Sequence, residues 1–287
     1  YPMPNSKIIL SADSTCDLGE ELKSRYQVHY YPFHIILNGK EYQDNVDIST
    51  EEIYRAYYKD HSLPQTAAIN AAEYVEYFRQ FTDQGYEVIH LNLGGALSSA
   101  HQNCLLAARE LKGVYPIDSQ NLSTGIALQV IAAADMIERG CSALEIVTHI
   151  KELRTRCHAS FILDTLDFMH AGGRCSSVVA LGAGILSLKP CIEVDNRTGA
   201  MSVGKKYRGK LSRVLVRYTK DQLEKYDHIR KDHIFITHSG IDPSLIEDVR
   251  NTILENGDFS EIHITKASCT ISAHCGPNTL GVLFLTD

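Results

Sequence analysis

The stretch EVIHLNLGGALSSAHQNCLLAARELKGVYPIDS, residues 87–119, contains the pattern that decides the fold. It begins with an apolar run at 87–93 that is typical of a buried strand, and it breaks at two glycines. A helix-like segment at 98–113 follows, and a second strand-like run closes the stretch at 114–119. Neighbouring parallel strands need a crossover of this kind, so the stretch predicts a strand–helix–strand unit on a parallel sheet.

The same alternation continues along most of the chain and predicts an α/β fold. We expect two domains: residues 1–155 with a mostly parallel sheet, and residues 156–287 as a second, smaller α/β domain with a mixed sheet. The mixed sheet is indicated by strand-like runs on both sides of a turn within 192–204. Strands are predicted at 7–13, 27–37, 87–93, 114–119, 158–164, 233–240, 261–268 and 279–287. Helices are predicted at 49–60, 71–85, 98–113, 124–140, 142–156, 178–190, 211–226 and 243–257.

Composition narrows the class of protein. The chain has 287 residues, 44% of them hydrophobic, which is enough for a core without disulfides or a structural metal. Its formal charge of −7, with no cluster of basic residues, argues against nucleic acid as a partner. The eight cysteines form no CxxC pair, so we expect reduced thiols and a cytoplasmic protein. We expect neither a transmembrane segment nor a secretory signal.

Polar residues gather where predicted strands pass into helices, which is where ligands bind in open α/β sheets. Ser98 and Ser99 follow Gly95 at the start of one helix, Thr66 precedes another, and His274 adjoins a Gly-Pro turn. Hydroxyl, imidazole and free backbone N–H groups are all donors, and together they suit a carboxylate or another anion. Each residue also has a structural interpretation, because serine and threonine commonly cap helices and most histidines are ordinary hydrogen-bonding residues.

Three other kinds of site were weighed against the same residues. A serine hydrolase would pair Ser98 with His274 and use Asp13 or Asp118 as the acid, although no GxSxG motif is present. A sugar or nucleotide-phosphate site could use the same donors, but the sequence contains neither GxGxxG nor GxxxxGKS. We expect no metal and no cofactor, because no HExxH, CxxC or clustered carboxylate set occurs.

Several separate stretches together resemble the DegV family of bacterial fatty-acid-binding proteins, in order and in spacing. The resemblance runs from about residue 7 to about residue 286. The stretches are DSTCDL (13–18), PQTAA (64–68), ALSSAHQNC (96–104), LDFMHAGGRCS (166–176), ILSLKPCIEV (185–194), KYRGK (206–210) and AHCGPNTLG (273–281).

The resemblance implies a binding protein rather than an enzyme. It implies two α/β domains that bury a long-chain fatty acid and present its carboxylate to the catalytic subunit of a fatty acid kinase. The carboxylate would be held by Thr66, Ser98 and His274, with no catalytic residue in the chain. The further residues that could contact the anion or the partner are Ser99, Gly95, Arg174 and Arg208.

The acyl tail would supply most of the affinity. About 14 methylenes buried at ~0.8 kcal/mol each give on the order of 11 kcal/mol, whereas a few neutral hydrogen bonds give ~1 kcal/mol each. The apolar, small-residue segment LGAGILSL suits the wall of a tunnel. The predicted tail pocket is formed by Gly182, Ala183, Gly184, Ile185 and Leu186.

Overall fold

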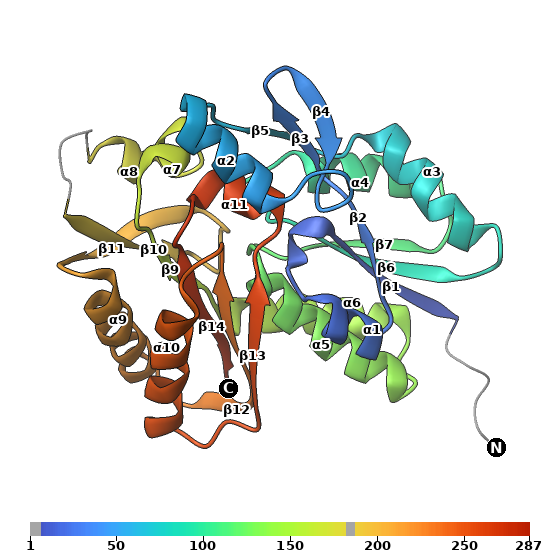
Figure 1. Ribbon diagram of the computed structural model, residues 1–287. Helices are drawn as coiled ribbons and strands as arrows, with labels where there is room; N and C mark the ends of the chain where they lie inside the picture. The colour runs from blue at the N-terminus through green and yellow to red at the C-terminus, as the bar shows by residue number, and fades with distance from the viewer. Residues whose placement is uncertain (1–6, 182–186) are drawn as a thin grey trace.

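The computed structural model describes residues 7–181 and 187–287, and two large sheets dominate it (Figure 1). The first sheet is wholly parallel, with strand order β2-β1-β6-β7. The stretch at 87–119 forms the predicted unit, in which α4 connects neighbouring strands β6 and β7. The strands are β1 (Ile8–Asp13), β2 (Val28–Tyr31), β6 (Glu87–Asn92) and β7 (Val114–Asp118). The accompanying helices are η1 (Ser14–Cys16), α1 (Glu20–Arg25), α2 (Thr50–Asp60), α3 (Ala71–Thr82), α4 (Ala100–Arg109), α5 (Thr124–Glu138) and α6 (Ala143–Leu153).

The second sheet is mixed, with the order β11-β10-β9-β14-β12-β13 and with β8 beside β14. Only β12 and β13 run parallel among its described pairs. The predicted α/β class, parallel first and mixed second, is therefore confirmed. The strands are β8 (Cys157–His158), β9 (Ser160–Ile162), β10 (Leu188–Val194), β11 (Met201–Arg208), β12 (Ile229–His238), β13 (Glu261–Lys266) and β14 (Leu280–Thr286). The helices are η2 (Arg154–Arg156), α7 (Asp167–Gly172), α8 (Ser176–Val179), α9 (Leu211–Lys225), α10 (Pro243–Glu255) and α11 (Cys269–Cys275).

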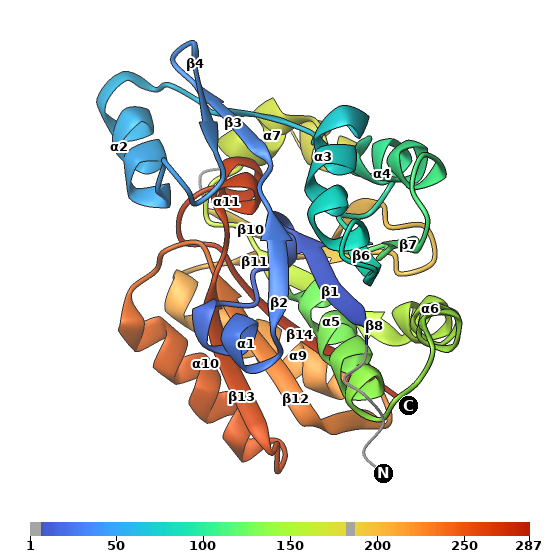
Figure 2. The same cartoon turned by 90° about the vertical axis from the view of Figure 1, so that its right-hand side faces the viewer.

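Helix α5 joins the two halves of the molecule. Its sequence TGIALQVIAAADMIE is apolar on most sides, as expected of a helix that is covered all round. It contacts β1 and β6 of the first sheet and β8, β12 and β14 of the second. Helices α3 and α4 cover the other side of the first sheet, and α9 and α10 cover the outer side of the second (Figures 1 and 2). The division at 155/156 stays a prediction, because one hydrophobic core runs across both halves.

A small third sheet lies over the join and carries part of the site. It is antiparallel with the order β4-β3-β5, formed by β3 (His34–Leu37), β4 (Lys40–Gln43) and β5 (Gln65–Ala67). The predicted strand at 27–37 is in fact two strands in different sheets, interrupted at Pro32. Proline fixes φ and has no N–H to donate to a ladder, so it favours a break there. Both β3 and β5 contact α11.

Three local predictions were wrong. Thr66 does not precede a helix directly: it lies in β5, and α3 begins only after Asn70, whose side chain caps it. His274 is not on a loop but in the last turn of α11. The helix predicted at 178–190 is contradicted at its end, because Leu188 begins strand β10. A short apolar run fits a buried strand and a buried helix equally well, so periodicity could not separate them.

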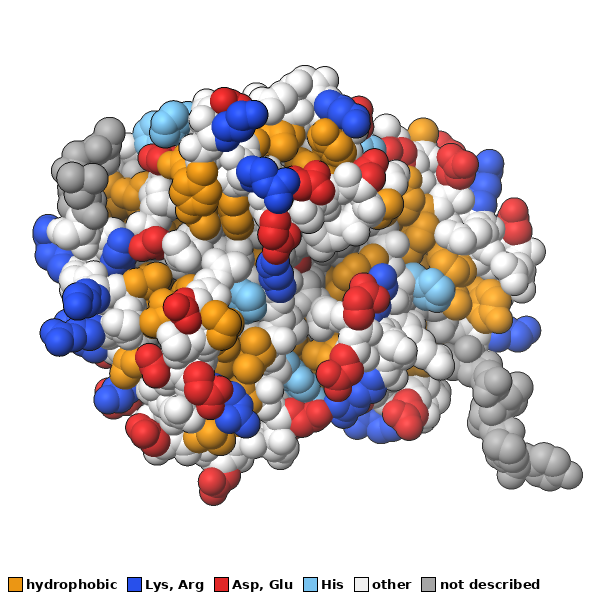
Figure 3. All heavy atoms as spheres, viewed as in Figure 1, with side chains coloured by type: hydrophobic (Ala, Val, Ile, Leu, Met, Phe, Trp, Pro, Cys, Tyr) orange, Lys and Arg blue, Asp and Glu red, His pale blue; other side chains and the backbone are white. Residues whose placement is uncertain are grey.

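The surface mixes both signs of charge. On the face shown in Figure 3, acidic and basic side chains are interspersed among apolar ones. Among the described residues, no helix combines the length and the apolarity that crossing a bilayer would require.

Candidate functional site

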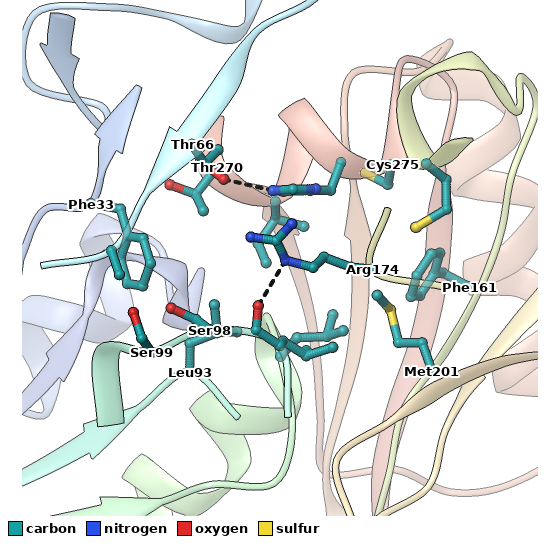
Figure 4. Close-up of a pocket in the computed structure, with 16 residues that line it drawn as sticks. Phe33, Thr66, Leu93, Ser98, Ser99, Phe161, Arg174, Met201, Thr270 and Cys275 are labelled. Carbon is teal, nitrogen blue, oxygen red and sulfur yellow. Dashed lines mark hydrogen bonds between the residues drawn. The ribbon is translucent and has the colours of Figure 1, made fainter. Parts of the chain in front are cut away.

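A cavity with an empty volume of about 690 Å³, part of it open to solvent, lies where the small sheet, the first sheet and α11 meet. Figure 4 shows hydroxyl side chains of Thr66, Thr270 and Ser98 on one side and Phe161, Met201 and Cys275 on the other. The lining residues are Phe33, Thr66, Ala68, Leu93, Leu97, Ser98, Ser99, Leu122, Phe161, Met169, Arg174, Met201, Thr270, Ile271, His274 and Cys275.

Thr66 and His274 meet in this cavity although 208 positions separate them in the sequence. Thr66 Oγ1 and His274 Nε2 lie 2.7 Å apart, which is hydrogen-bonding distance. Strand β5 supplies the threonine and the last turn of α11 supplies the histidine. The structure therefore brings two of the three predicted carboxylate-binding residues into direct contact.

The imidazole of His274 is neutral at ordinary pH. Burial, together with the positive charge of Arg174, lowers its pKa to about 4. Its Nδ1 has no hydrogen-bond partner in the described part of the chain and lies against Gly172. A Cβ at position 172 would come within 2.4 Å of that nitrogen, so only glycine leaves the ring this position. Gly172, the first glycine of the HAGGRCS stretch, is therefore required by the packing of the His274 ring.

Two buried acidic side chains fix the other end of α11. Asp17 accepts the backbone N–H of Ser268 at 2.9 Å. Asp44 accepts the backbone N–H of Cys269 at 2.8 Å and the hydroxyl of Thr270 at 2.7 Å. These oxygens satisfy N–H groups of the first turn that have no partner within the helix. These contacts fix the axis of α11 and, through it, the position of the His274 ring.

Ser98 lies at the end of the Gly-Gly loop between β6 and α4 and faces the cavity (Figure 4). Its Oγ accepts the backbone N–H of Ala100, the first residue of α4, at 3.1 Å, although Ser99 rather than Ser98 occupies the N-cap position. That bond uses the hydroxyl only as an acceptor, which leaves its proton free to be donated to a ligand. The structural and ligand-binding interpretations of Ser98 are thus compatible.

Arg174 extends into the cavity beside these donors (Figure 4). Its Nε donates to the carbonyl of Leu97 at 3.0 Å, and its Nη1 donates to the carbonyl of Gly172 at 2.8 Å. These two bonds fix the guanidinium near the Thr66–His274 pair. A positive charge held in this way favours an anionic ligand at this end of the cavity.

The remaining residues predicted from sequence to contact the anion or the partner differ in whether they line the cavity. Ser99 lines the cavity, whereas Gly95 does not: its N–H donates to Asp118 Oδ1 at 3.0 Å. Arg208 ends β11, is exposed and also lies outside the cavity lining. The predicted tail pocket of Gly182, Ala183, Gly184, Ile185 and Leu186 lies outside the described residues.

A second cavity, with an empty volume of about 340 Å³, adjoins the first. Both are lined by Leu122, Phe161, Ile271 and Cys275, so the two hollows share a wall of mostly apolar side chains. Residues of the paired strands β12 and β14 border the second cavity, among them Thr237, Gly281 and Leu283. Sequence analysis missed these lining residues, because they come from several separate elements and none stands out by type.

The geometry does not assemble the hydrolase considered from sequence. Within the described residues, no hydrogen bond joins Ser98 to His274, since Ser98 contacts Ala100 and His274 contacts Thr66. Asp13, one candidate acid, accepts His90 Nε2 at 2.8 Å instead. The other, Asp118, accepts the backbone N–H groups of Gly95 and Gln120. A nucleophilic serine needs a base within reach and an acid to orient that base, and this arrangement supplies neither.

A buried polar network below the cavity was also missed. The carboxylate of Asp13 accepts bonds from Tyr74 at 2.6 Å, from His90 at 2.8 Å and from the backbone N–H of Leu93 at 2.9 Å. His90 in turn contacts Ser11 Oγ at 2.8 Å. All four side chains in the network are inaccessible to solvent, and the network fixes the start of the loop that carries Ser98. Its role is therefore to position that loop.

Fold and site together define a class: a two-sheet α/β protein whose apolar cavity ends in a group of hydrogen-bond donors. The chain matches the family model described as "Uncharacterised protein, DegV family" over residues 7–287. It is 30% identical to a DegV domain-containing protein of Caldanaerobacter subterraneus, over 97% of this chain and 98% of that protein. The chain belongs to the DegV family.

Two solved structures extend the comparison. A DegV family protein from Thermus thermophilus, reported for its fatty acid binding, is 26% identical with a TM-score of 0.86. The match covers 98% of this chain and 99% of that chain. A stearic acid-binding protein from Eubacterium ventriosum is 22% identical with a TM-score of 0.82 and 98% coverage of both chains, and it shows the same fold.

Proposed function

We propose that this protein binds a long-chain fatty acid, with the carboxylate at Thr66, Ser98 and His274 and the tail in the two adjoining cavities. The observation that carries the proposal is the pairing of Thr66 with His274 at the polar end of an apolar hollow. The fatty-acid-binding Thermus thermophilus relative, similar along almost the whole chain, supports the same ligand class.

The donors at the polar end suit a carboxylate better than a larger anion. Ser98 offers a hydroxyl proton, and Thr66 offers a second one when its oxygen accepts the Nε2–H of the neutral His274. Arg174 adds a fixed positive charge nearby. A carboxylate oxygen can accept from two donors at once, and bonds to an ionised acceptor are the stronger kind. The head of the ligand would thus be oriented without burying an unpaired charge.

The tail would enter the second cavity past the shared wall of Leu122, Phe161, Ile271 and Cys275. Burying ~14 methylenes at ~0.8 kcal/mol each gives on the order of 11 kcal/mol before the costs of association are subtracted. The tail would then set the affinity, and the polar end would set the orientation.

Lipid extraction from protein purified without added lipid tests the binding proposal. We expect mass spectrometry to find long-chain fatty acid in the extract, or delipidated protein to take up oleate or palmitate at one molecule per chain. Sugar phosphates and nucleotides would serve as competing ligands. The absence of bound fatty acid combined with no uptake would contradict the proposal.

We further propose that the protein presents the bound acid to a fatty acid kinase catalytic subunit. A carboxylate oxygen would attack the γ-phosphorus of ATP, forming an acyl phosphate and releasing ADP, with ATP held by the partner. The exposed side chains of Ser99 and Arg174 at the cavity support access to the carboxylate from outside.

Incubation with a bacterial fatty acid kinase catalytic subunit, ATP and labelled fatty acid tests this second step. Hydroxylamine converts an acyl phosphate into a stable hydroxamate, which we expect only when both proteins are present. A protein that binds fatty acid but yields no hydroxamate would retain the binding function and contradict the kinase role alone.

A further inference from the structure

Three metal-ligating side chains meet on the second sheet, on the strand pair β12–β13. His233, Glu261 and His263 each place one ligand atom so that all three atoms lie within 4.8 Å of one another. They are the one such group of histidine, cysteine or acidic residues found among residues 7–181 and 187–287. No part of the fatty acid site includes them.

The parallel register of β12 and β13 creates this arrangement. His233 pairs directly with Glu261, and Phe235 pairs with His263. Side chains two positions apart share one face of a strand, so all three ligands project from the same face of the sheet. Ile262 projects from the opposite face, where it packs in the core cluster of that side. The His-x-Phe and Glu-x-His patterns are 28 residues apart and give no metal motif in the sequence.

The distances approach those of a metal centre. His233 Nδ1 lies 2.9 Å from His263 Nε2 and 3.5 Å from a carboxylate oxygen of Glu261. Ligands held at ~2.0–2.1 Å in a tetrahedron around Zn²⁺ are separated by roughly 3.3 Å, so a small rotation of the rings would admit an ion. The two rings are nearly parallel, at 21°, and the His263 ring packs on Phe235.

Arg25 forms an ion pair with Glu261 on the outer side of the cluster. Arg25 contacts both oxygens, at 2.5 and 3.1 Å, and orients the carboxylate from outside. The side chain of Glu261 is 34% exposed and that of His233 is 13% exposed, so an ion can enter from solvent.

We propose that His233 Nδ1, His263 Nε2 and Glu261 form a binding site for a divalent transition metal ion of the Zn²⁺, Co²⁺ or Ni²⁺ type. Two imidazoles and one carboxylate are a donor set that these ions favour over Mg²⁺ or Ca²⁺, which prefer oxygen ligands. Three protein ligands leave a fourth position for water. This proposal departs from the expectation, drawn from the sequence, that the protein has no metal site.

Calorimetric titration of tag-free, chelator-treated full-length protein with ZnCl₂ tests the site, and CoCl₂ gives an independent spectroscopic readout. We expect one ion per chain, with at least tenfold weaker binding in His263→Gln and in His233→Asn. His149→Ala is the matched control, because it removes a histidine on α6 outside the cluster and should bind as the wild type does. Circular dichroism and fatty acid uptake of each variant would show that the fold is intact.

Two results would overturn the proposal. One is the absence of stoichiometric binding of Zn²⁺, Co²⁺ and Ni²⁺ to the folded wild type. The other is stoichiometric binding that persists at unchanged affinity in both folded variants, which would place the ion elsewhere. MgCl₂ should give no binding at the same concentrations, and equal affinity for Mg²⁺ would also contradict the donor set.

Discussion

At the scale of single residues, the polar end of the cavity depends on one contact between distant parts of the chain. Thr66 Oγ1 and His274 Nε2 are 2.7 Å apart, and the neutral ring can donate or accept there. Because the ring is held by packing against Gly172, its direction is fixed before any ligand arrives. Fixed donors cost less entropy when a ligand binds than donors that must first be ordered.

Replacing Thr66 by valine keeps the shape of the side chain and removes its hydroxyl. A hydrogen bond to a charged group contributes ~1.5–3 kcal/mol, so we expect Thr66→Val to weaken fatty acid binding about tenfold to a hundredfold. Titration calorimetry with palmitate measures this loss. The same substitution should weaken the binding of methyl palmitate, which has no carboxylate, much less. An equal loss for acid and ester would contradict a role for Thr66 at the carboxylate.

Replacing Gly172 by alanine adds one methyl group against the His274 ring. The new Cβ would lie too close to Nδ1, so the ring has to leave the position in which it contacts Thr66. We expect Gly172→Ala to weaken fatty acid binding at least severalfold although it removes no polar group. The NMR chemical shifts of the His274 ring in isotope-labelled protein should also change, because the ring is displaced. Unchanged affinity together with unchanged shifts would show that the ring is not confined by this glycine.

At the scale of elements, helix α11 links the halves of the molecule through the buried acids at its N-terminus. Asp17 accepts the N–H of Ser268 and the hydroxyl of Ser123, at 2.9 and 2.6 Å. Burial raises the pKa of Asp17 from 3.8 to about 8, since desolvation outweighs these hydrogen bonds. Protonation of this carboxyl and the stability of α11 are therefore linked.

Replacing Asp17 by asparagine should change the pH dependence of stability in a defined direction. Between pH 4 and pH 8 the folded wild type binds this proton more tightly than the unfolded chain, so this group's contribution to stability falls as pH rises. Asparagine does not titrate. We expect the free energy of unfolding of Asp17→Asn, minus that of the wild type, to increase from pH 4 to pH 8 and then level off. Urea denaturation at a series of pH values measures this difference in unfolding free energy. A difference that stays constant or decreases from pH 4 to pH 8 would contradict the raised pKa of Asp17.

At the scale of the whole molecule, the cavities exist because two sheets meet around α5 and leave space beside α11. The second cavity is bordered by β12 and β14 from one side and by the shared apolar wall from the other. If the acyl tail occupies it as proposed, its limited volume sets an upper length for that tail. The same strand β12 carries Thr237 at this cavity and His233 at the proposed metal site.

Filling the second cavity should shift chain-length preference. Ala267 is 5% exposed and lines this cavity, so Ala267→Leu occupies space there. Each methylene kept out of the cavity costs ~0.8 kcal/mol, so we expect stearate and palmitate to bind more weakly while shorter acids are less affected. A series of saturated acids measured by calorimetry shows the shift. Ala72→Leu, on an exposed position of α3, is the matched control, and the same preference in both variants would place the tail elsewhere.

The sequence by itself predicted the order and type of most elements and the α/β class, because periodicity and turn residues act locally. The unit at 87–119 and the strand pair within 192–204 formed as predicted. The residues alone indicated Thr66, Ser98 and His274 as donors suited to an anion and left their structural interpretation open, and the family resemblance assigned them to the carboxylate of a fatty acid. Local patterns failed where contacts from elsewhere in the chain decide the structure, as at Leu188, which joins a strand rather than a helix.

Only the tertiary structure decided which side chains meet. It placed Thr66 in a separate small sheet against the last turn of α11, and it put Gly172 beside the His274 ring. It joined two cavities through residues of unrelated elements and aligned His233 with Glu261 through strand register. The physical reason is that hydrophobic burial and backbone pairing set the positions of strands and helices, and the distances between side chains far apart in sequence follow from those positions.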